Sequence, residues 1–320
     1  MSERYPRLLA TIGRTSGWRI LLGLFLAAVV LVSSGVAVVF LASAGAALVG
    51  VHDPFSRRAL GVDQPLGLLA NNLAIAMITP SVVLAVLVAH RARPGWLASV
   101  AGRLRWSLLV RFCAIALVVV GIAFLASMLV PGQNAGVVHI PGAGRLTALL
   151  VVIALSTPLQ AAGEEFGFRG YLTQLIAART ARPVLGAVAA GAVTATLFAL
   201  AHGTQDPWLF SDRLAFGLVA SWLVWRTGGL EASIALHIAT NVISLGYSAV
   251  TGSLDDTLHA ATLDWSSAVI DITSILLFAV VVDRCARRWH IVVRREVGPS
   301  GADDPTGSSD FGSVSRGRLS

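Results

Sequence analysis

The most prominent pattern in the sequence is a series of long, almost uncharged apolar runs that lack the alternation of soluble helices or strands. A helix needs about 20 apolar residues to cross a bilayer, and most of these runs are long enough. They predict an all-α polytopic membrane protein with about eight transmembrane helices in one bundle. The runs cover Ile20–Val51, Leu66–Ala89, Phe112–Val130, Leu146–Gly163, Val184–Ala201, Leu214–Trp225, Ala232–Val250 and Trp265–Val282. The sixth run is short, so it is expected to be tilted, re-entrant or buried among its neighbours.

The composition also indicates a protein that lies in a lipid bilayer. Of 320 residues, 55% are hydrophobic and 13% are charged, whereas soluble domains carry about 25% charged residues. All 24 basic residues are arginine, which, with abundant Ala, Gly and Val, is typical of a GC-rich bacterial genome. We therefore expect the arginines behind the net charge of +7 to interact with anionic lipids of a bacterial plasma membrane and not with nucleic acid. The two cysteines, Cys113 and Cys285, support neither a disulfide framework nor a metal cluster.

Arginines are distributed unequally between the segments that join the runs. Such a bias marks the cytoplasmic side of a membrane protein. With the N-terminus inside, the outer segments hold only Arg57, Arg58, Arg145 and Arg213. The sequence therefore predicts that both termini are cytoplasmic. The inner segments hold Arg4, Arg7, Arg14, Arg19, Arg91, Arg93, Arg103, Arg105, Arg169, Arg179, Arg182, Arg226, Arg284, Arg287, Arg288, Arg294 and Arg295.

Three short motifs place polar or charged side chains at or near the ends of apolar runs, where their default interpretation is functional. They are GEEFGFRG at Gly163–Gly170, FALAH at Phe198–His202 and HIATN at His237–Asn241. In each motif, the key residues are four positions apart and share one face of a helix. Each motif alone is more simply explained as a salt-bridged helix end or an interfacial histidine, but their joint presence favours a site.

The first motif contains two adjacent glutamates with different predicted partners. Glu165 lies four residues before Arg169, so the two are expected to form an ion pair on one helix face. Adjacent helical positions diverge by about 100°. Glu164 is therefore expected to point away from that pair and to be free for another task.

The order Glu-Glu-x-x-x-Arg, Phe-x-x-x-His and His-x-x-x-Asn on successive apolar segments resembles the CAAX-protease and bacteriocin-processing (CPBP, or Abi) family. This family includes CAAX prenyl endopeptidases and bacterial bacteriocin-processing or immunity proteins. FRGYL after the glutamates and RTGGLEASIALH before the last motif are also similar to the family. The resemblance covers about Leu146–Val250 and implies an intramembrane endopeptidase.

The resemblance implies a role for each motif residue. Glu164 would activate the attacking water as a general base, assisted by His202, while His237 and Asn241 would stabilise the oxyanion. Outside this catalytic set, Glu165, Arg169 and Phe198 would have structural or orienting roles. The implied partners are the bilayer and a peptide or lipidated-protein substrate, although cleavage after a prenylated cysteine is not carried over to a bacterium.

No cofactor is expected, but a zinc-dependent mechanism is an open alternative in which Glu164, His202 and His237 bind the metal. Against it, the sequence lacks the His-Glu-x-x-His signature of helical zinc proteases. Two further alternatives are a non-catalytic scaffold or immunity protein of the same fold, and a transporter with a buried proton relay. The intact set of motifs favours the enzyme.

The predicted organisation has five parts. Residues 1–17 form a cytoplasmic segment, 18–144 accessory transmembrane helices, 145–250 the catalytic core, 251–297 the last transmembrane helix with its basic flank, and 298–320 a disordered tail. One conflict remains: the run boundaries put Glu164 at the inner end of the fourth span and His202 at the outer end of the fifth. Either the fourth span continues through YLTQLI, or Pro158 and the glycines break it, or the sixth run is re-entrant. The other five histidines are expected to be solvated.

Overall fold

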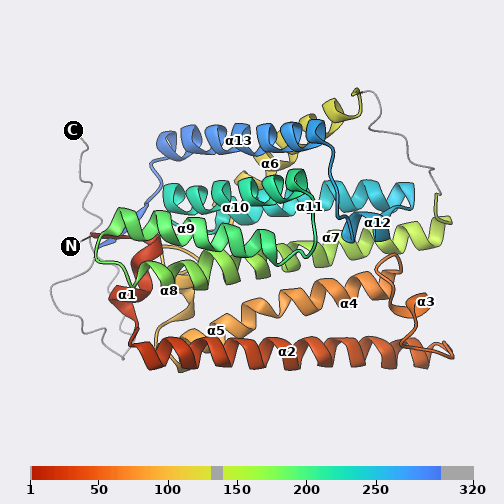
Figure 1. Cartoon of the computed structure of the whole chain (residues 1–320), viewed down its shortest axis with the longest axis horizontal. Helices are drawn as coiled ribbons and strands as arrows, with labels where there is room; N and C mark the ends of the chain where they lie inside the picture. The colour runs from red at the N-terminus through yellow and green to blue at the C-terminus, as the bar shows by residue number, and fades with distance from the viewer. Residues whose placement is uncertain (1, 131–139, 297–320) are drawn as a thin grey trace.

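The computed structural model describes residues 2–130 and 140–296. Within these ranges the chain is an elongated bundle of helices that run roughly along its long axis (Figure 1). The predicted tail at 298–320 lies outside the described residues. The longer helices are α2 (Gly17–Leu48), α4 (Pro65–Ala76), α5 (Ile78–Val88), α6 (Trp106–Ser127), α7 (Ala143–Glu165), α9 (Pro183–Leu200), α10 (Pro207–Thr227), α11 (Glu231–Thr251) and α13 (Trp265–Arg288).

The remaining elements are short, and most of them lie at the ends of the bundle. Strands β1 (Ser2–Arg4) and β2 (Arg294–Glu296) form a two-stranded antiparallel sheet. The remaining short helices are η1 (Tyr5–Arg7), α1 (Leu8–Ile12), α3 (Arg57–Leu60), η2 (Pro94–Leu97), α8 (Thr173–Ala177) and α12 (Leu254–Leu258), and the segment η3 (Phe166–Leu172) is a π-helix between α7 and α8.

Seven segments of the described chain are long and apolar enough to cross a membrane. They confirm a multi-pass all-α protein. The short sixth run becomes α10, which contacts α9, α11 and α13 within the bundle. Although α10 is not among the seven apolar segments, it also runs along the bundle, and the pairing of β1 with β2 places both described ends of the chain at the same end of the bundle (Figure 1).

The fourth span is longer than the apolar run that predicts it. It extends from Ala143 to Ala177 as one path of 35 residues, with Pro158 inside α7 and the π-helical segment η3 within it. By contrast, α9 has 18 residues and rises only about 27 Å. Figure 1 shows α9 ending beside the middle of this long path. Of the three explanations for the conflict over Glu164 and His202, the structure supports the first: the fourth span continues through YLTQLI, so Glu164 lies within a long helical path and not at its end.

The second span bends at Met77, between α4 and α5. Pro80 has no amide hydrogen to give to the carbonyl of Ala76 four residues earlier, and its ring crowds that carbonyl. The bend lies against the two glycines of the GEEFG sequence. A Cβ atom on Gly163 would lie 2.9 Å from the Ile75 carbonyl oxygen, and one on Gly167 would lie 2.7 Å from Ile78 Cγ2. The glycines therefore let the second span approach the glutamates closely.

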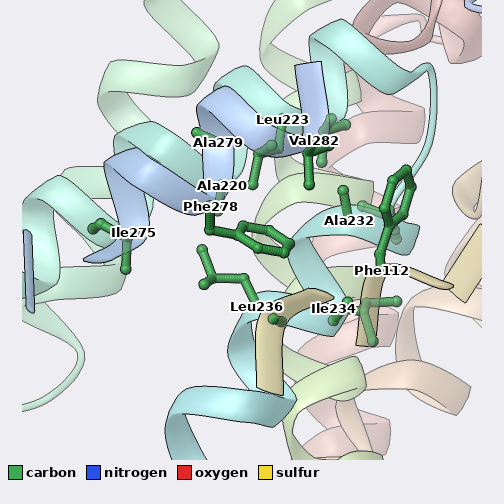
Figure 2. Packing of buried hydrophobic residues seen from close by; sticks show 14 of the residues in the cluster. Phe112, Ala220, Leu223, Ala232, Ile234, Leu236, Ile275, Phe278, Ala279 and Val282 are labelled. Carbon is green, nitrogen blue, oxygen red and sulfur yellow. The ribbon is translucent and has the colours of Figure 1, made fainter. Parts of the chain in front are cut away.

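The largest apolar core lies between α6, α10, α11 and α13 (Figure 2). Phe112 on α6 and Phe278 on α13 are fully buried in it. The small residues Ala220 on α10 and Ala232 on α11 allow these helices to pack closely around them. This core holds α11, which carries the HIATN motif, against its neighbours.

Polar groups fasten the N-terminal residues to the bundle. Tyr5 donates a hydrogen bond to the carbonyl of Leu97, and the backbone amide of Leu9 donates to Gln174 Oε1 at 3.0 Å.

The prediction that all five histidines outside the motifs are solvated is wrong for His90. It is buried, with Nδ1 3.0 Å from the Arg14 carbonyl oxygen and Nε2 2.9 Å from the Tyr171 hydroxyl.

Candidate active site

The two adjacent glutamates at the end of α7 face different partners. Glu165 Oε1 accepts hydrogen bonds from Arg169 Nη1 at 3.0 Å and from His237 Nδ1 at 2.9 Å. The side chains of Glu165 and Arg169 are fully buried. The ion pair predicted from the spacing is therefore present, and it also reaches the third motif on α11.

An aromatic enclosure surrounds the buried guanidinium of Arg169. The guanidinium carbon lies 4.2 Å from the ring centre of Phe198 and 5.6 Å from that of Phe216. Arg169 Nε and Nη2 have no hydrogen-bond partner among the described residues. The ring faces offer cation–π attraction where further acceptors would otherwise be required.

Glu164 points to the other side of the site. Its Oε1 accepts a 2.6 Å hydrogen bond from Gln160 Nε2, and its Oε2 lies 3.7 Å from His237 Nε2. The separation of 3.7 Å is too long for a direct hydrogen bond. Glu164 Oε2 is buried and has no hydrogen-bond partner within the described residues. Glu165 Oε2 also lacks a partner within these residues, but Glu164 Oε2 is the free acceptor on the side of His237 Nε2.

The hydrogen bonds fix which nitrogen each histidine presents. Because ionised Glu165 can only accept, His237 Nδ1 carries a hydrogen and Nε2 is the atom turned toward Glu164. His202 Nδ1 lies 2.7 Å from the Phe198 carbonyl oxygen, so it also carries a hydrogen. Its Nε2 is left for another partner.

Asn241 and His202 reach the glutamates indirectly. Asn241 Nδ2 donates to Gln160 Oε1 at 3.0 Å, and Gln160 in turn contacts Glu164. His202 follows α9 and packs against Phe198, with 4.7 Å between ring centres, while Phe198 is 5.8 Å from the ring of His237. The structure thus places His237 3.7 Å from Glu164 and links Asn241 to Glu164 through the amide of Gln160, while His202 contacts the ring of Phe198.

A metal centre was the main chemical alternative for these residues. Over residues 2–130 and 140–296, no group of three or more histidine, cysteine, aspartate or glutamate side chains is arranged to hold a metal ion. Glu164 Oε2 and His237 Nε2 are 3.7 Å apart, and the rings of His202 and His237 both pack against Phe198. The zinc-dependent alternative with Glu164, His202 and His237 stays a prediction that only a metal-dependence experiment can test.

Sequence reasoning misses two residues of the site. Gln160 lies four residues before Glu164 on the same helical face, and a polar residue in an apolar run is a signal that could have found it. Phe216 on α10 lies 5.0 Å from His237 and stacks on Phe198 at 5.5 Å between ring centres. An aromatic residue in an apolar helix carries no such signal.

Comparison with known proteins identifies the same part of the chain. Residues 143–243 match the family model described as "Type II CAAX prenyl endopeptidase Rce1-like". Over 106 residues, the chain is 29% identical to "Uncharacterized protein YyaK" of Bacillus subtilis (strain 168). This alignment covers 31% of the present chain and 34% of that relative, so the chain spans about a third of the relative's length.

The matched segment contains the glutamate, phenylalanine–histidine and histidine–asparagine motifs together with Gln160 and Phe216. Members of the Rce1-like family are generally membrane proteases. The resemblance to the CAAX-protease and bacteriocin-processing family is confirmed by the match of residues 143–243 to the Rce1-like family model, within a chain that has several membrane-spanning helices.

Proposed function

We propose that this protein is an intramembrane endopeptidase in which Glu164 activates water to hydrolyse a peptide bond. The observation that carries the proposal is the free Oε2 atom of buried Glu164, 3.7 Å from His237 Nε2. Two polar atoms at this separation can both hydrogen-bond a single water molecule. The family match to a protease domain supports the same chemistry.

In the proposed reaction, water attacks the carbonyl carbon and gives a proton to Glu164 Oε2. His237 Nε2 and Asn241 stabilise the oxyanion, Asn241 through the Nδ2 hydrogen that Gln160 does not use. Collapse of the tetrahedral intermediate breaks the carbon–nitrogen bond, and Glu164 returns the proton to the leaving amine. His202 Nε2 assists by accepting a hydrogen bond from the attacking water.

Glu165 and Arg169 orient this machinery without touching the substrate. Arg169 forms an ion pair with the carboxylate of Glu165, and Glu165 holds the ring of His237 by accepting its Nδ1–H. Phe198 fixes Arg169 from one face and packs against both histidine rings. A ring held in this way keeps Nε2 aimed at the same point, which favours catalysis by positioning.

The proposed substrate is a membrane-associated or lipidated protein, because the site lies on helices that are apolar on their outer faces. We further propose that the protein resides in a bacterial plasma membrane with both termini in the cytoplasm, on the basis of its arginine distribution. A non-catalytic scaffold of the same fold is the rival function. It requires neither the free carboxylate oxygen nor the histidine beside it.

Comparative proteomics of membrane fractions would test the function even while the natural substrate is unidentified. Cells with the wild-type protein are compared with cells carrying Glu164→Ala at equal protein abundance. The proposal predicts new protein termini in the wild type that are missing from the variant. Identical sets of termini, with an unchanged phenotype, would favour the scaffold.

A further inference from the structure

Gln160 is the only residue of the site shown to contact both Glu164 and Asn241 within the described part of the chain. It lies on α7 with 7% of its surface exposed. Its Nε2 is 2.6 Å from Glu164 Oε1, and its Oε1 is 3.0 Å from Asn241 Nδ2. Both polar atoms of one buried amide are therefore engaged by residues that the proposed reaction uses.

The carboxylate of Glu164 determines the direction of both hydrogen bonds in this bridge. An ionised carboxylate can only accept hydrogen bonds, so the NH₂ group of Gln160 must face Glu164. The carbonyl of Gln160 then faces α11, and the NH₂ group of Asn241 must turn toward it. The charge on Glu164 thus sets the orientation of two amides on two helices.

We propose, on the basis of the function proposed above, that Gln160 is a positioning residue that couples the general base to the oxyanion site. By occupying Oε1 of Glu164, Gln160 leaves Oε2 as the oxygen that takes the proton from water. By accepting one Nδ2 hydrogen of Asn241, it leaves the other to point at the oxyanion. One side chain thereby sets the relative placement of base and oxyanion donor.

Two variants separate the hydrogen bonds from the shape of the side chain. Gln160→Glu is almost isosteric but places an acceptor against Glu164, whereas Gln160→Met keeps the length and removes both polar atoms. If Gln160 positions Glu164 and the amide of Asn241, Gln160→Glu should lower kcat more than Gln160→Met. Misplacing a catalytic group by about 1 Å costs up to about 10² in rate, so losses of about 10-fold for Met and 100-fold for Glu are expected, with KM changing far less.

Gln174 provides a matched control on the same path of helix. It is also buried and also uses both polar atoms, accepting from the Leu9 amide and donating to the Trp96 carbonyl. Its contacts lie at the end of the bundle that carries η1 and η2, away from the glutamates. Gln174→Glu and Gln174→Met should lower the melting temperature without changing kcat of the folded protein.

The deciding measurement is kcat and KM of the purified, reconstituted full-length protein on a peptide that the wild type cleaves. Gln160→Met is also combined with Asn241→Ala. Because both act through one bridge, the double variant should lose less kcat than the product of the single losses. Full multiplicativity, or wild-type kcat in Gln160→Glu, would overturn the role of Gln160 alone. An inactive wild-type protein would instead overturn the proposed function and this role with it.

Discussion

His237 Nδ1 lies 2.9 Å from Glu165 Oε1, and this one hydrogen bond decides that Nε2 of the same ring faces Glu164. Two adjacent glutamates thus act on opposite sides of one histidine. Glu165 fixes the ring, while Glu164 is left with a free oxygen on the far side of it. Substitutions at the two positions should therefore have different effects, one on stability and the other on catalysis.

Glu165→Ala should strongly destabilise the protein. It leaves the fully buried guanidinium of Arg169 without its ion-pair partner, and breaking a buried pair from one side costs roughly 3–5 kcal/mol. The control is Asp255→Ala, which breaks a pair with Arg57, whose side chain is 82% exposed. Such a surface pair contributes at most about 1 kcal/mol. Melting temperatures in detergent should fall far more for Glu165→Ala, and equal shifts would show that the buried pair is not structural.

Gly217→Ala should also destabilise the site. A Cβ atom at this position would lie 2.7 Å from both Cα and Cβ of Ala195 and 3.2 Å from Arg169 Nη2. Overpacking of this kind typically costs about 1–3 kcal/mol.

Gly246→Ala is the matched control, because a Cβ there meets no atom within 4 Å. A glycine in a helix interior costs about 1 kcal/mol relative to alanine. Gly246→Ala should therefore leave the melting temperature unchanged or raise it. If both alanines are tolerated equally, the close contact between α9 and α10 at Arg169 is not present in the membrane.

Residue spacing could predict what lies on one helix and not what lies between helices. The Glu165–Arg169 pair and the Phe198–His202 contact follow from four-residue spacing. The bridge from Gln160 to Asn241 and the enclosure of Arg169 by Phe216 depend on which helices are neighbours. Hydropathy does not contain that information.

The sequence pattern also failed to predict where Glu164 lies along its helix. The apolar run ends before Glu164, so a hydropathy pattern places this residue at the membrane face. The helical path continues to Ala177, because the charges of Glu165 and Arg169 neutralise each other inside the bundle. The burial of His90 could not be predicted from spacing either, because its partners, Arg14 and Tyr171, are distant in sequence.

The arginine distribution predicts that the bundle end carrying β1 and β2 faces the cytoplasm. Single-cysteine proteins test this prediction after Cys113 and Cys285 are replaced by alanine. A membrane-impermeant thiol reagent should label Ala261→Cys in intact cells and label Ser2→Cys only after lysis. Labelling of Ser2→Cys alone in intact cells would reverse the orientation. Labelling of both cysteines in intact cells would place them on the same side, so that an even number of crossings separates them.

Removal of divalent metals should leave cleavage unchanged if Glu164 works without zinc. The purified protein is treated with a strong chelator, dialysed and assayed, and its melting temperature is recorded to detect loss of structure. A loss of cleavage that only added zinc restores would replace the proposed mechanism with the metalloprotease alternative. A parallel fall in melting temperature would indicate a structural metal instead.

The role of Glu164 as general base is tested most directly by the rate of peptide cleavage by purified Glu164→Gln. The substitution keeps the size of the side chain and removes the basic carboxylate, and loss of a general base typically costs about 10²–10⁴ in rate. Glu231→Gln is the control, because Glu231 is also fully buried but pairs with Arg105 outside the site. We expect Glu164→Gln to melt near the wild-type temperature but to lose cleavage, while folded Glu231→Gln retains it. Wild-type cleavage by Glu164→Gln would contradict the assignment of Glu164 as the general base.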